Sequence, residues 1–288
     1  MNSPIKRLDH VAVVNRELQG LEDAYTRMGF LLTPTSRHSG SLNAGAPVVP
    51  MGSGNRCAMF KEGYLELLCV VDPDLDHERI DVMLARHKGI HIMAFGCDDS
   101  PAAQHYLNAA GFNLPAPHLL ERMAETSQGQ QLLRFRNLRL TLEDMPEGNV
   151  IVIKHETPDL LWEPQLMDHP NGVVGLTEVV LCVADVEEAT ARYQRLLGVE
   201  PSRNGEIARF SVPRGRFVVV SPGALPEVAP GASAPNLPFP AAFTVSVENL
   251  AATEELFTET GVPCKKDSTR LTVPAEAGCG ATVIFEQA

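Results

Sequence analysis

Short apolar segments recur along the chain, and each is followed by a stretch with helical spacing and then by a glycine. The first such segment is 8–14, Leu-Asp-His-Val-Ala-Val-Val. Similar segments open near residues 89, 176 and 242. The separation from the aligned strand position to the glycine is 29 − 10 = 19 from His10, 111 − 91 = 20 from His91, 198 − 178 = 20 from Glu178 and 261 − 242 = 19 from Ala242. Agreement within one residue indicates a fourfold internal repeat.

Each repeat continues with strand-like sequence. Runs rich in β-branched and apolar residues flank turn signals at 61–63, 145–149 and 213–215, and 270–273 pairs with 282–285 around a glycine-containing turn. The unit is therefore β-α-β-β-β. Leu18, Leu21, Tyr25 and Met28 lie near one face of the first helix, and the glycine suits a left-handed helix end. The predicted fold class is α+β, with four βαβββ modules paired into two domains with curved mixed sheets.

The module pairs set the expected domain boundaries. Residues 1–157 hold modules one and two, 158–173 form an ordered linker that contains Trp162, and 174–288 hold modules three and four. The proline-rich stretch 222–240 joins modules three and four, and it reads either as a surface connector or as a lid.

Charge and composition exclude several classes of partner. The net charge is 24 − 36 = −12 and the pI is near 5.2, so the surface repels phosphate backbones and nucleic acid is not expected as a partner. The sequence has neither a signal-peptide pattern at its start nor an apolar run long enough for a membrane span. The six cysteines are dispersed without a CxxC pair, which favours reduced thiols in a cytoplasmic protein.

Candidate chemistry gathers in the first half. The aligned first-strand positions are His10, His91, Glu178 and Ala242, and the last strand of module one carries Glu66 among apolar residues. Two imidazoles and a carboxylate suit a divalent metal: non-haem Fe(II) with open positions, or Zn with a fourth ligand. The alternative is that each is a satisfied structural residue.

The last strand of module two offers a fourth ligand, His155 or Glu156, of which only one can serve because neighbouring strand residues point to opposite faces. The second half has Glu178 and Glu286 only, and no metal is expected there.

Several motifs resemble those of a known family. The fourfold plan with His10, Glu66 and His91 resembles the vicinal oxygen chelate superfamily of glyoxalases and extradiol dioxygenases. More narrowly, the chain resembles its glyoxalase-like domain branch, through motifs at 8–10, 54–56, 64–67, 157–160 and 169–172. The resemblance implies two glyoxalase-like domains, with a divalent ion (Fe, Zn, Mn, Ni or Co) held by His10, Glu66, His91 and a fourth group, for which His155 or Glu156 is the candidate. Units of this plan often pair across chains, so a homodimer is compatible with it.

Three readings of function follow from this resemblance. The first is a metal-dependent lyase or isomerase that acts on a small oxygen-chelating substrate, with Glu66 as a ligand or a proton shuttle. The second is an Fe(II) extradiol-type dioxygenase. The third is a non-catalytic protein that binds or sequesters a small molecule.

Three arginines are candidate substrate-binding residues. Arg134 and Arg136 lie in phase on one strand, where they either line the site and bind a carboxylate or phosphate, or face outward as solvated charges. Arg56 follows Asn55 in one of the family-like motifs. The segments 37–40 and 52–56 bracket a long loop that is either a rim over a pocket or a surface loop.

Overall fold

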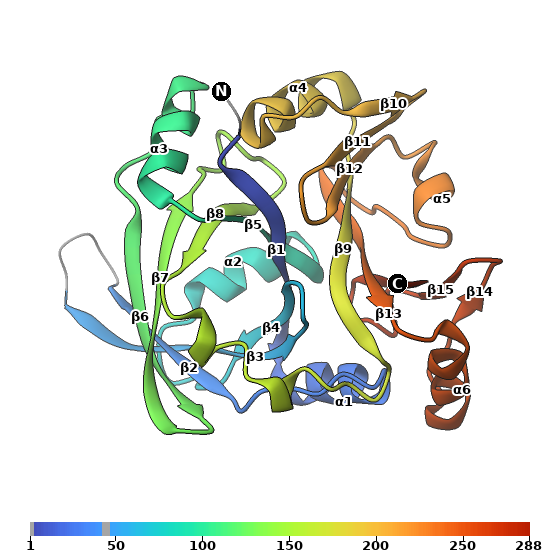
Figure 1. Cartoon of the computed structure of the whole chain (residues 1–288), viewed down its shortest axis with the longest axis horizontal. Coiled ribbons are helices and arrows are strands. Elements are labelled where there is room, and N and C mark those ends of the chain that lie inside the picture. The colour runs from blue at the N-terminus through green and yellow to red at the C-terminus, as the bar shows by residue number, and fades with distance from the viewer. Residues whose placement is uncertain (1–2, 42–46) are drawn as a thin grey trace.

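The chain forms two curved, mixed eight-stranded sheets that lie side by side (Figure 1). The computed structural model describes residues 3–41 and 47–288. The strand order is β2-β3-β4-β1-β5-β8-β7-β6 in the first sheet, called sheet A, and β10-β11-β12-β9-β13-β16-β15-β14 in the second, called sheet B. The architecture is α+β, as predicted.

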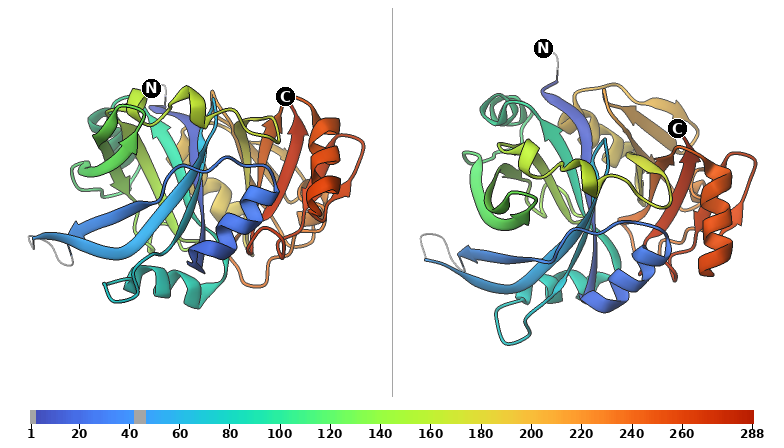
Figure 2. Two further views of the ribbon diagram at one scale, coloured as in Figure 1. Left: turned by 90° about the horizontal axis from the view of Figure 1, so that it is seen from below. Right: turned by 60° about the horizontal axis from the view of Figure 1, so that its bottom comes forward.

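Sheet A contains the strands that carry the candidate chemistry. Its members are β1 (Ile5–Glu17), β2 (Ser36–Ser41), β3 (Val48–Met59), β4 (Tyr64–Val70), β5 (Gly89–Cys97), β6 (His118–Thr126), β7 (Gly129–Arg139) and β8 (Asn149–His155). The centre of the sheet is β1, which pairs in parallel with β4 and antiparallel with β5. The β2–β3 hairpin projects from the body of the molecule (Figure 2).

Sheet B repeats this order. Its strands are β9 (Val173–Cys182), β10 (Ser202–Asn204), β11 (Ile207–Ser211), β12 (Arg216–Val220), β13 (Phe239–Val247), β14 (Lys265–Lys266), β15 (Arg270–Val273) and β16 (Thr282–Gln287). The segment between the sheets holds two short 3-10 turns, η1 (Pro158–Leu160) and η2 (Pro164–Leu166).

One helix follows the first strand of each module. These helices are α1 (Leu18–Arg27), α3 (Ser100–Ala109), α4 (Val186–Leu197) and α6 (Leu250–Thr260), joined by the shorter α2 (Glu78–Arg86) and α5 (Leu225–Val228). The glycines that end the repeated helices, at 29, 111, 198 and 261, all have positive φ, as the repeat predicted. The carboxylate of Asp99 caps α3 by accepting from the Ala102 amide at 2.9 Å.

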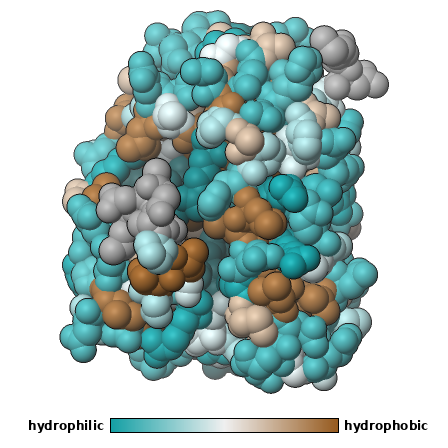
Figure 3. All heavy atoms as spheres, turned by 90° about the vertical axis from the view of Figure 1, so that its left-hand side faces the viewer, coloured by the Kyte–Doolittle hydropathy of each residue, from teal (hydrophilic) through white to brown (hydrophobic). Residues whose placement is uncertain are grey.

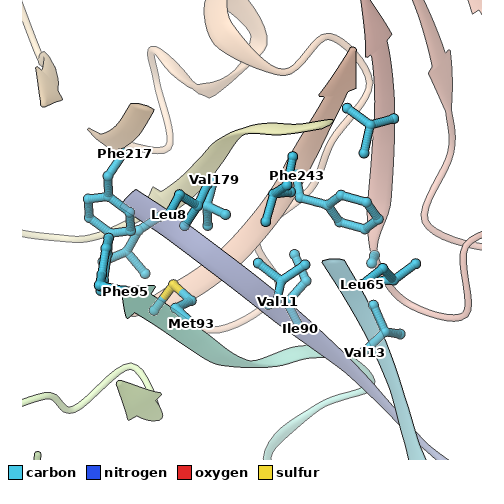
Figure 4. Packing of buried hydrophobic residues seen from close by; sticks show 14 of the residues in the cluster. Leu8, Val11, Val13, Leu65, Ile90, Met93, Phe95, Val179, Phe217 and Phe243 are labelled. Carbon is cyan, nitrogen blue, oxygen red and sulfur yellow. The ribbon is translucent and has the colours of Figure 1, made fainter. Parts of the chain in front are cut away.

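The two sheets share one hydrophobic core between their central strands. Val11 and Val13 of β1 and Met93 of β5 pack toward Val179 and Phe243 of sheet B (Figure 4). Because side chains alternate along a strand, the residues between them face the opposite, concave side of sheet A, here called the cup. Ala12, Val14, Ile92 and Ala94 belong to a separate apolar cluster on that side.

Helix α2 lies inside the cup. Its residues Ile80 and Met83 pack in the same cluster as Ala12 and Val14 of β1. The repeat did not predict α2, which lies outside the βαβββ unit, and it did not place β2 or β6, whose sequences lack an alternation of apolar and polar residues. No helix in the described part of the chain has the length and apolar character of a membrane span.

Candidate functional site

His10 stands on the cup side of β1 and is held there by its neighbour Asp9. Asp9 is the extra residue of a bulge: Leu8 and His10 pair with the consecutive residues Phe95 and Ala94. The bulge turns the Asp9 carboxylate toward the imidazole, and Oδ1 of Asp9 lies 2.9 Å from Nδ1 of His10. Although burial opposes it, the pKa of Asp9 lies far below its ordinary value because His155 and His10 surround the carboxylate. The ionised Asp9 therefore accepts a hydrogen bond from Nδ1 and holds the ring so that Nε2 is directed toward Glu66.

Glu66 is fixed beside His10 on the adjacent strand β4. Its Oε1 accepts from Nδ2 of Asn55 at 2.5 Å, and Oδ1 of Asn55 accepts from Nη1 of Arg122 at 2.9 Å. The same Arg122 nitrogen donates to Oγ of Ser36 at 2.9 Å. The strands β2 and β6 are the two edges of sheet A. The hydrogen bond from Arg122 of β6 to Ser36 of β2 therefore connects the two edges across the open side of the cup.

The imidazole of His10 and the carboxylate of Glu66 face each other. Nε2 of His10 lies 3.9 Å from Oε2 of Glu66, and the two side chains are only 4% and 12% exposed. The ring of Tyr64 stacks on the imidazole with 4.3 Å between centroids. Burial raises the pKa of Glu66, but His10, His38, Asn55 and Arg122 together lower it below its ordinary value, so the carboxylate is ionised.

His91 does not join this pair. It is the extra residue of a bulge in β5, because Ala12 and Val13 pair with Ile92 and Ile90. Its Nε2 donates to the carbonyl of His87 at 2.8 Å, and its ring stacks on His87 at 3.9 Å. His87 in turn packs on Phe239 of sheet B. The bulge therefore places His91 away from His10 and Glu66, contrary to the sequence expectation.

Apolar residues occupy the positions that correspond to His10 and Glu66 in module two. Ile92 precedes Gly111 by 111 − 92 = 19 residues, the same separation as from His10 to Gly29. In module one, His10 pairs with Tyr64, and Glu66 lies two residues after Tyr64. In module two, Ile92 pairs with Asn149, so the counterpart of Glu66 is Ile151, two residues after Asn149. Both isoleucines belong to the apolar cluster of the cup.

His155 lies in the cup but does not contact Glu66. Its Nε2 donates to Oδ1 of Asp9 at 3.0 Å, and its ring packs edge-on against Trp162 at 4.8 Å. Its Nδ1 is buried without a hydrogen-bond partner in the described structure. Glu156, the alternative ligand, is bound by Arg136 and Lys154 on the other side of the strand.

The three predicted substrate-binding arginines face away from the cup. Arg134 pairs with Glu121 at 2.8 Å and Arg136 with Glu156 at 2.9 Å, because the alternate residues Leu133 and Phe135 face the cup. Arg56 binds Glu22 at 2.7 Å and the Thr33 carbonyl at 2.6 Å. These arginines therefore form ion pairs on the side of sheet A that faces away from the cup, and they do not line the site.

The carboxylates of the second half form ion pairs. Arg216 donates to Glu178 at 2.9 Å and to Glu286 at 2.8 Å. Arg216 of sheet B therefore neutralises both carboxylates.

A cavity of about 520 Å³ opens at the edge of sheet A, between β2, β6 and the 3-10 turns. Asn55, Cys57 and Arg122 lie in its wall, so it reaches the immediate neighbours of Glu66. Arg37 and Ser39 also line it, which places part of the predicted rim loop at the cavity. Leu132, Leu160 and Leu166 provide an apolar wall. On this face, Figure 3 shows a hollow with a hydrophilic base beside hydrophobic patches.

Sequence reasoning missed several residues of this site. Asp9 and Asn55 stood inside motifs used for the resemblance, directly before His10 and Arg56, but no role was predicted for them. Arg122 lies on the unpredicted β6. His38, expected at the surface, donates to or accepts from Ser53 at 3.1 Å, and burial lowers its pKa to about 4.

A family model described as "Glyoxalase-like domain" matches residues 8–197. The chain belongs to this family. The match contains the whole cup and its His10–Glu66 pair. No curated protein matches the sequence.

Solved structures with the same fold cover nearly the whole chain at low identity. A hypothetical protein from Staphylococcus aureus is 12% identical, with a TM-score of 0.63 over 99% of this chain and 100% of that chain. The Mn(II)-bound glyoxalase from Novosphingobium aromaticivorans is 10% identical, with a TM-score of 0.57 over 98% and 82%. The 2,3-dioxygenase LapB from Pseudomonas sp. KL28 is 11% identical, with a TM-score of 0.57 over 100% and 94%. At these identities the likeness establishes the fold.

The residues of this glyoxalase-like chain do not fit the four-ligand metal site that its sequence predicted. His10 and Glu66 supply two converging donors, and Asp9 orients His10 as a carboxylate orients a metal-binding histidine. The other two donors are displaced, since His91 is bulged away and Nε2 of His155 is engaged by Asp9. Within residues 3–41 and 47–288, no group of three His, Cys, Asp or Glu side chains is arranged to hold a metal ion.

Proposed function

We propose that this glyoxalase-like protein is an enzyme that transfers a proton on a small oxygen-bearing molecule bound in the cup. The observation that carries the proposal is the facing pair of His10 Nε2 and Glu66 Oε2, 3.9 Å apart. Each partner is fixed from behind, His10 by Asp9 and Glu66 by Asn55. Proton transfer needs a base whose orientation and tautomer are set before the substrate binds.

The roles of the residues follow from their arrangement. With the Nδ1 proton of His10 directed at Asp9, Nε2 accepts a proton from a carbon next to a carbonyl group and returns it to a neighbouring atom of the same molecule. The ionised Asp9 and Glu66 stabilise the imidazolium that forms between these two steps. Arg122 carries a buried Nε without a partner in the described structure, and it provides positive charge beside the developing oxyanion.

The metal-dependent readings predicted from the sequence need more donors than this pair. Both a metal-dependent lyase or isomerase and an Fe(II) dioxygenase place three or four protein ligands around the ion. Two of the four predicted ligands, His10 and Glu66, are in position, so the proposed proton transfer relies on these side chains directly.

Deuterium exchange tests the proposal. Small 2-oxo acids and hydroxyketones are incubated with the protein in D₂O, and NMR follows deuterium at the carbon next to the carbonyl. We expect exchange for at least one compound, with His10→Gln and Glu66→Gln slower by roughly 10²-fold or more. The control His105→Gln, an exposed histidine on α3, keeps the wild-type rate. Equal exchange by His10→Gln would refute the assignment of the base.

A second candidate function is the binding of a small molecule without catalysis. The leucine-rich wall of the 520 Å³ cavity favours it, because such a wall buries the apolar part of a ligand. Recovery of one compound unchanged and tightly bound, with no exchange in any mixture, would favour this function over catalysis.

A further inference from the structure

Two arginines without a carboxylate partner stand on the wall of the cup opposite His10 and Glu66. Arg79 lies in the first turn of α2 and Arg139 ends β7. In the described residues, neither forms an ion pair, and Arg79 makes one hydrogen bond, from Nη2 to Oδ1 of Asn149 at 3.3 Å. By contrast, Arg134 and Arg136, on the other face of β7, each pair with a glutamate.

The register of the sheet places Arg139 on the cup side. The pairing of β7 with β8 is regular from Phe135, which pairs with His155, to Arg139, which pairs with Ile151. Because side chains alternate along a strand, Arg139 lies on the same face as Phe135, four residues before it. Ile151 pairs with Ala94, and Ala94 pairs with His10. Arg139 and His10 therefore stand at the two ends of one row across the curved sheet.

The neighbouring row places Arg79. Arg79 donates to Asn149 of β8. The row that begins at Asn149 continues through Ile92 of β5 and Ala12 of β1, and it ends at Glu66 of β4. Since Asn149 and Ile151 are two residues apart on β8, Arg79 and Arg139 lie beside each other. The two guanidinium groups thus face the same space as the His10–Glu66 pair.

The pKa shifts of the two arginines agree with this placement, because Glu66 acts on both. Burial lowers the pKa of Arg139 to about 10, with a further lowering by Arg79, while Glu66 raises it. Burial lowers the pKa of Arg79, and Glu66 again opposes the change. Two adjacent cations with one shared anion leave an excess of positive charge, in a chain whose net charge is −12. Such a local excess of positive charge favours the binding of an anion.

A further unpaired group lies on the same strand face. Oδ1 of Asn137, two residues before Arg139, is buried without a hydrogen-bond donor in the described structure. A hydroxyl group of a ligand anchored at Arg139 would supply that donor, since buried polar atoms are rarely left unpaired.

We propose that Arg79 and Arg139 form an anion-binding subsite that holds the carboxylate or phosphate group of the substrate. The inference rests on the proposed function, and it gives the substrate a class: a small organic anion whose charged group is bound at one wall of the cup. Planar guanidinium groups bind such oxyanions through paired charge-assisted hydrogen bonds. The carbon skeleton then extends toward His10.

Calorimetric titration with inorganic phosphate and with malonate tests the subsite without requiring turnover. We expect saturable binding that weakens with salt, and a loss of about tenfold or more in affinity in Arg79→Gln and in Arg139→Gln. We expect the variants to keep the fold, because the substitutions remove no structural side-chain hydrogen bond in the described residues other than the one from Arg79 to Asn149. The matched control Arg134→Gln, on the opposite face of the same strand, keeps wild-type affinity. Tighter binding of phosphate indicates a phosphate ester, and tighter binding of malonate indicates a carboxylate.

Two further variants separate this inference from the proposed reaction. Glu66→Gln should bind either anion more tightly, because it removes the negative charge that both arginines sense. His10→Gln should keep anion affinity while it loses deuterium exchange. If anion binding follows the arginine variants but no compound exchanges, only the proposed reaction fails. The subsite is refuted if the wild type shows no saturable binding, or if Arg134→Gln weakens binding as much as Arg139→Gln.

Discussion

Asp9 fixes the orientation of His10: its Oδ1 lies 2.9 Å from the Nδ1 of that imidazole. The same oxygen accepts from Nε2 of His155 at 3.0 Å, so one buried carboxylate organises two histidines. This arrangement exists because Asp9 is bulged out of the regular ladder of β1. The carboxylate thereby sets which nitrogen of His10 faces Glu66.

Replacing this carboxylate should impair the reaction more than the fold. Asp9→Asn offers an amide that can donate to Nδ1 and so favours the opposite tautomer of His10. We expect deuterium exchange to fall by roughly 10²-fold or more. The control is Asp98→Asn, which removes an exposed partner of Arg7 without touching His10. If Asp9→Asn keeps the wild-type rate, Asp9 does not set the tautomer.

Metal removal should leave the protein unchanged. Two converging donors bind a divalent ion weakly compared with three or four. We expect elemental analysis to find well below one equivalent of Fe, Zn, Mn, Ni or Co, and EDTA to leave the thermal midpoint and the exchange rate as they were. One equivalent of metal in the wild type, lost in His10→Gln, would instead restore the metal site predicted from the sequence.

The histidine pair beside β13 should make stability depend on pH. Burial lowers the pKa of His91 from 6.5 to about 4, and the neighbouring His87 contributes to the lowering. A histidine with a depressed folded pKa takes up its proton first in the unfolded chain, so its contribution is complete above pH 6.5 and is lost as the pH falls toward 4.

Urea unfolding at pH 7.5 and pH 5 measures this effect. His91→Gln keeps a donor for the His87 carbonyl but does not titrate. We expect it to lose less stability than the wild type between the two pH values, by about 2 kcal/mol at most. The exposed His118→Gln serves as the control. Equal losses in wild type and His91→Gln would contradict the expectation.

A buried ion pair joins the two halves of the chain. Arg192 of α4 binds Glu147, which precedes β8, at 2.8 Å, and the Glu147 side chain is fully buried. Tyr193 also donates to Glu147. Glu147→Gln leaves the guanidinium without its buried counter-charge, and we expect a loss of about 3 kcal/mol in the free energy of unfolding.

The matched control for this pair is Arg203→Gln. Arg203 pairs with Glu187 at the surface, where an ion pair contributes roughly 0–1 kcal/mol. Denaturant unfolding compares the two variants. Similar small losses in both would show that solvent or Glu188, the second partner of Arg192, replaces the buried contact.

The fold followed from the sequence because its signals are local and repeated. The glycines at 29, 111, 198 and 261 end helices in the left-handed conformation, and the apolar strand segments form the central strands of the sheets. Strands β2 and β6 were missed because their sequences lack an alternation of apolar and polar residues. Arg122 and the cavity wall therefore could not be placed beforehand.

The candidate site could be predicted from the sequence only in part. The sequence by itself determined that His10 and Glu66 lie in the first and last apolar strand segments of the first module, where strand pairing could bring them together. Tertiary structure decided the rest through two single-residue bulges. Because side chains alternate with a period of two, one extra residue in β5 turns His91 off the cup, and one in β1 turns Asp9 toward His10. The separation from strand to glycine does not reveal the bulge in the sequence, because Glu178, which pairs regularly with Arg216, also precedes its glycine by 20 residues.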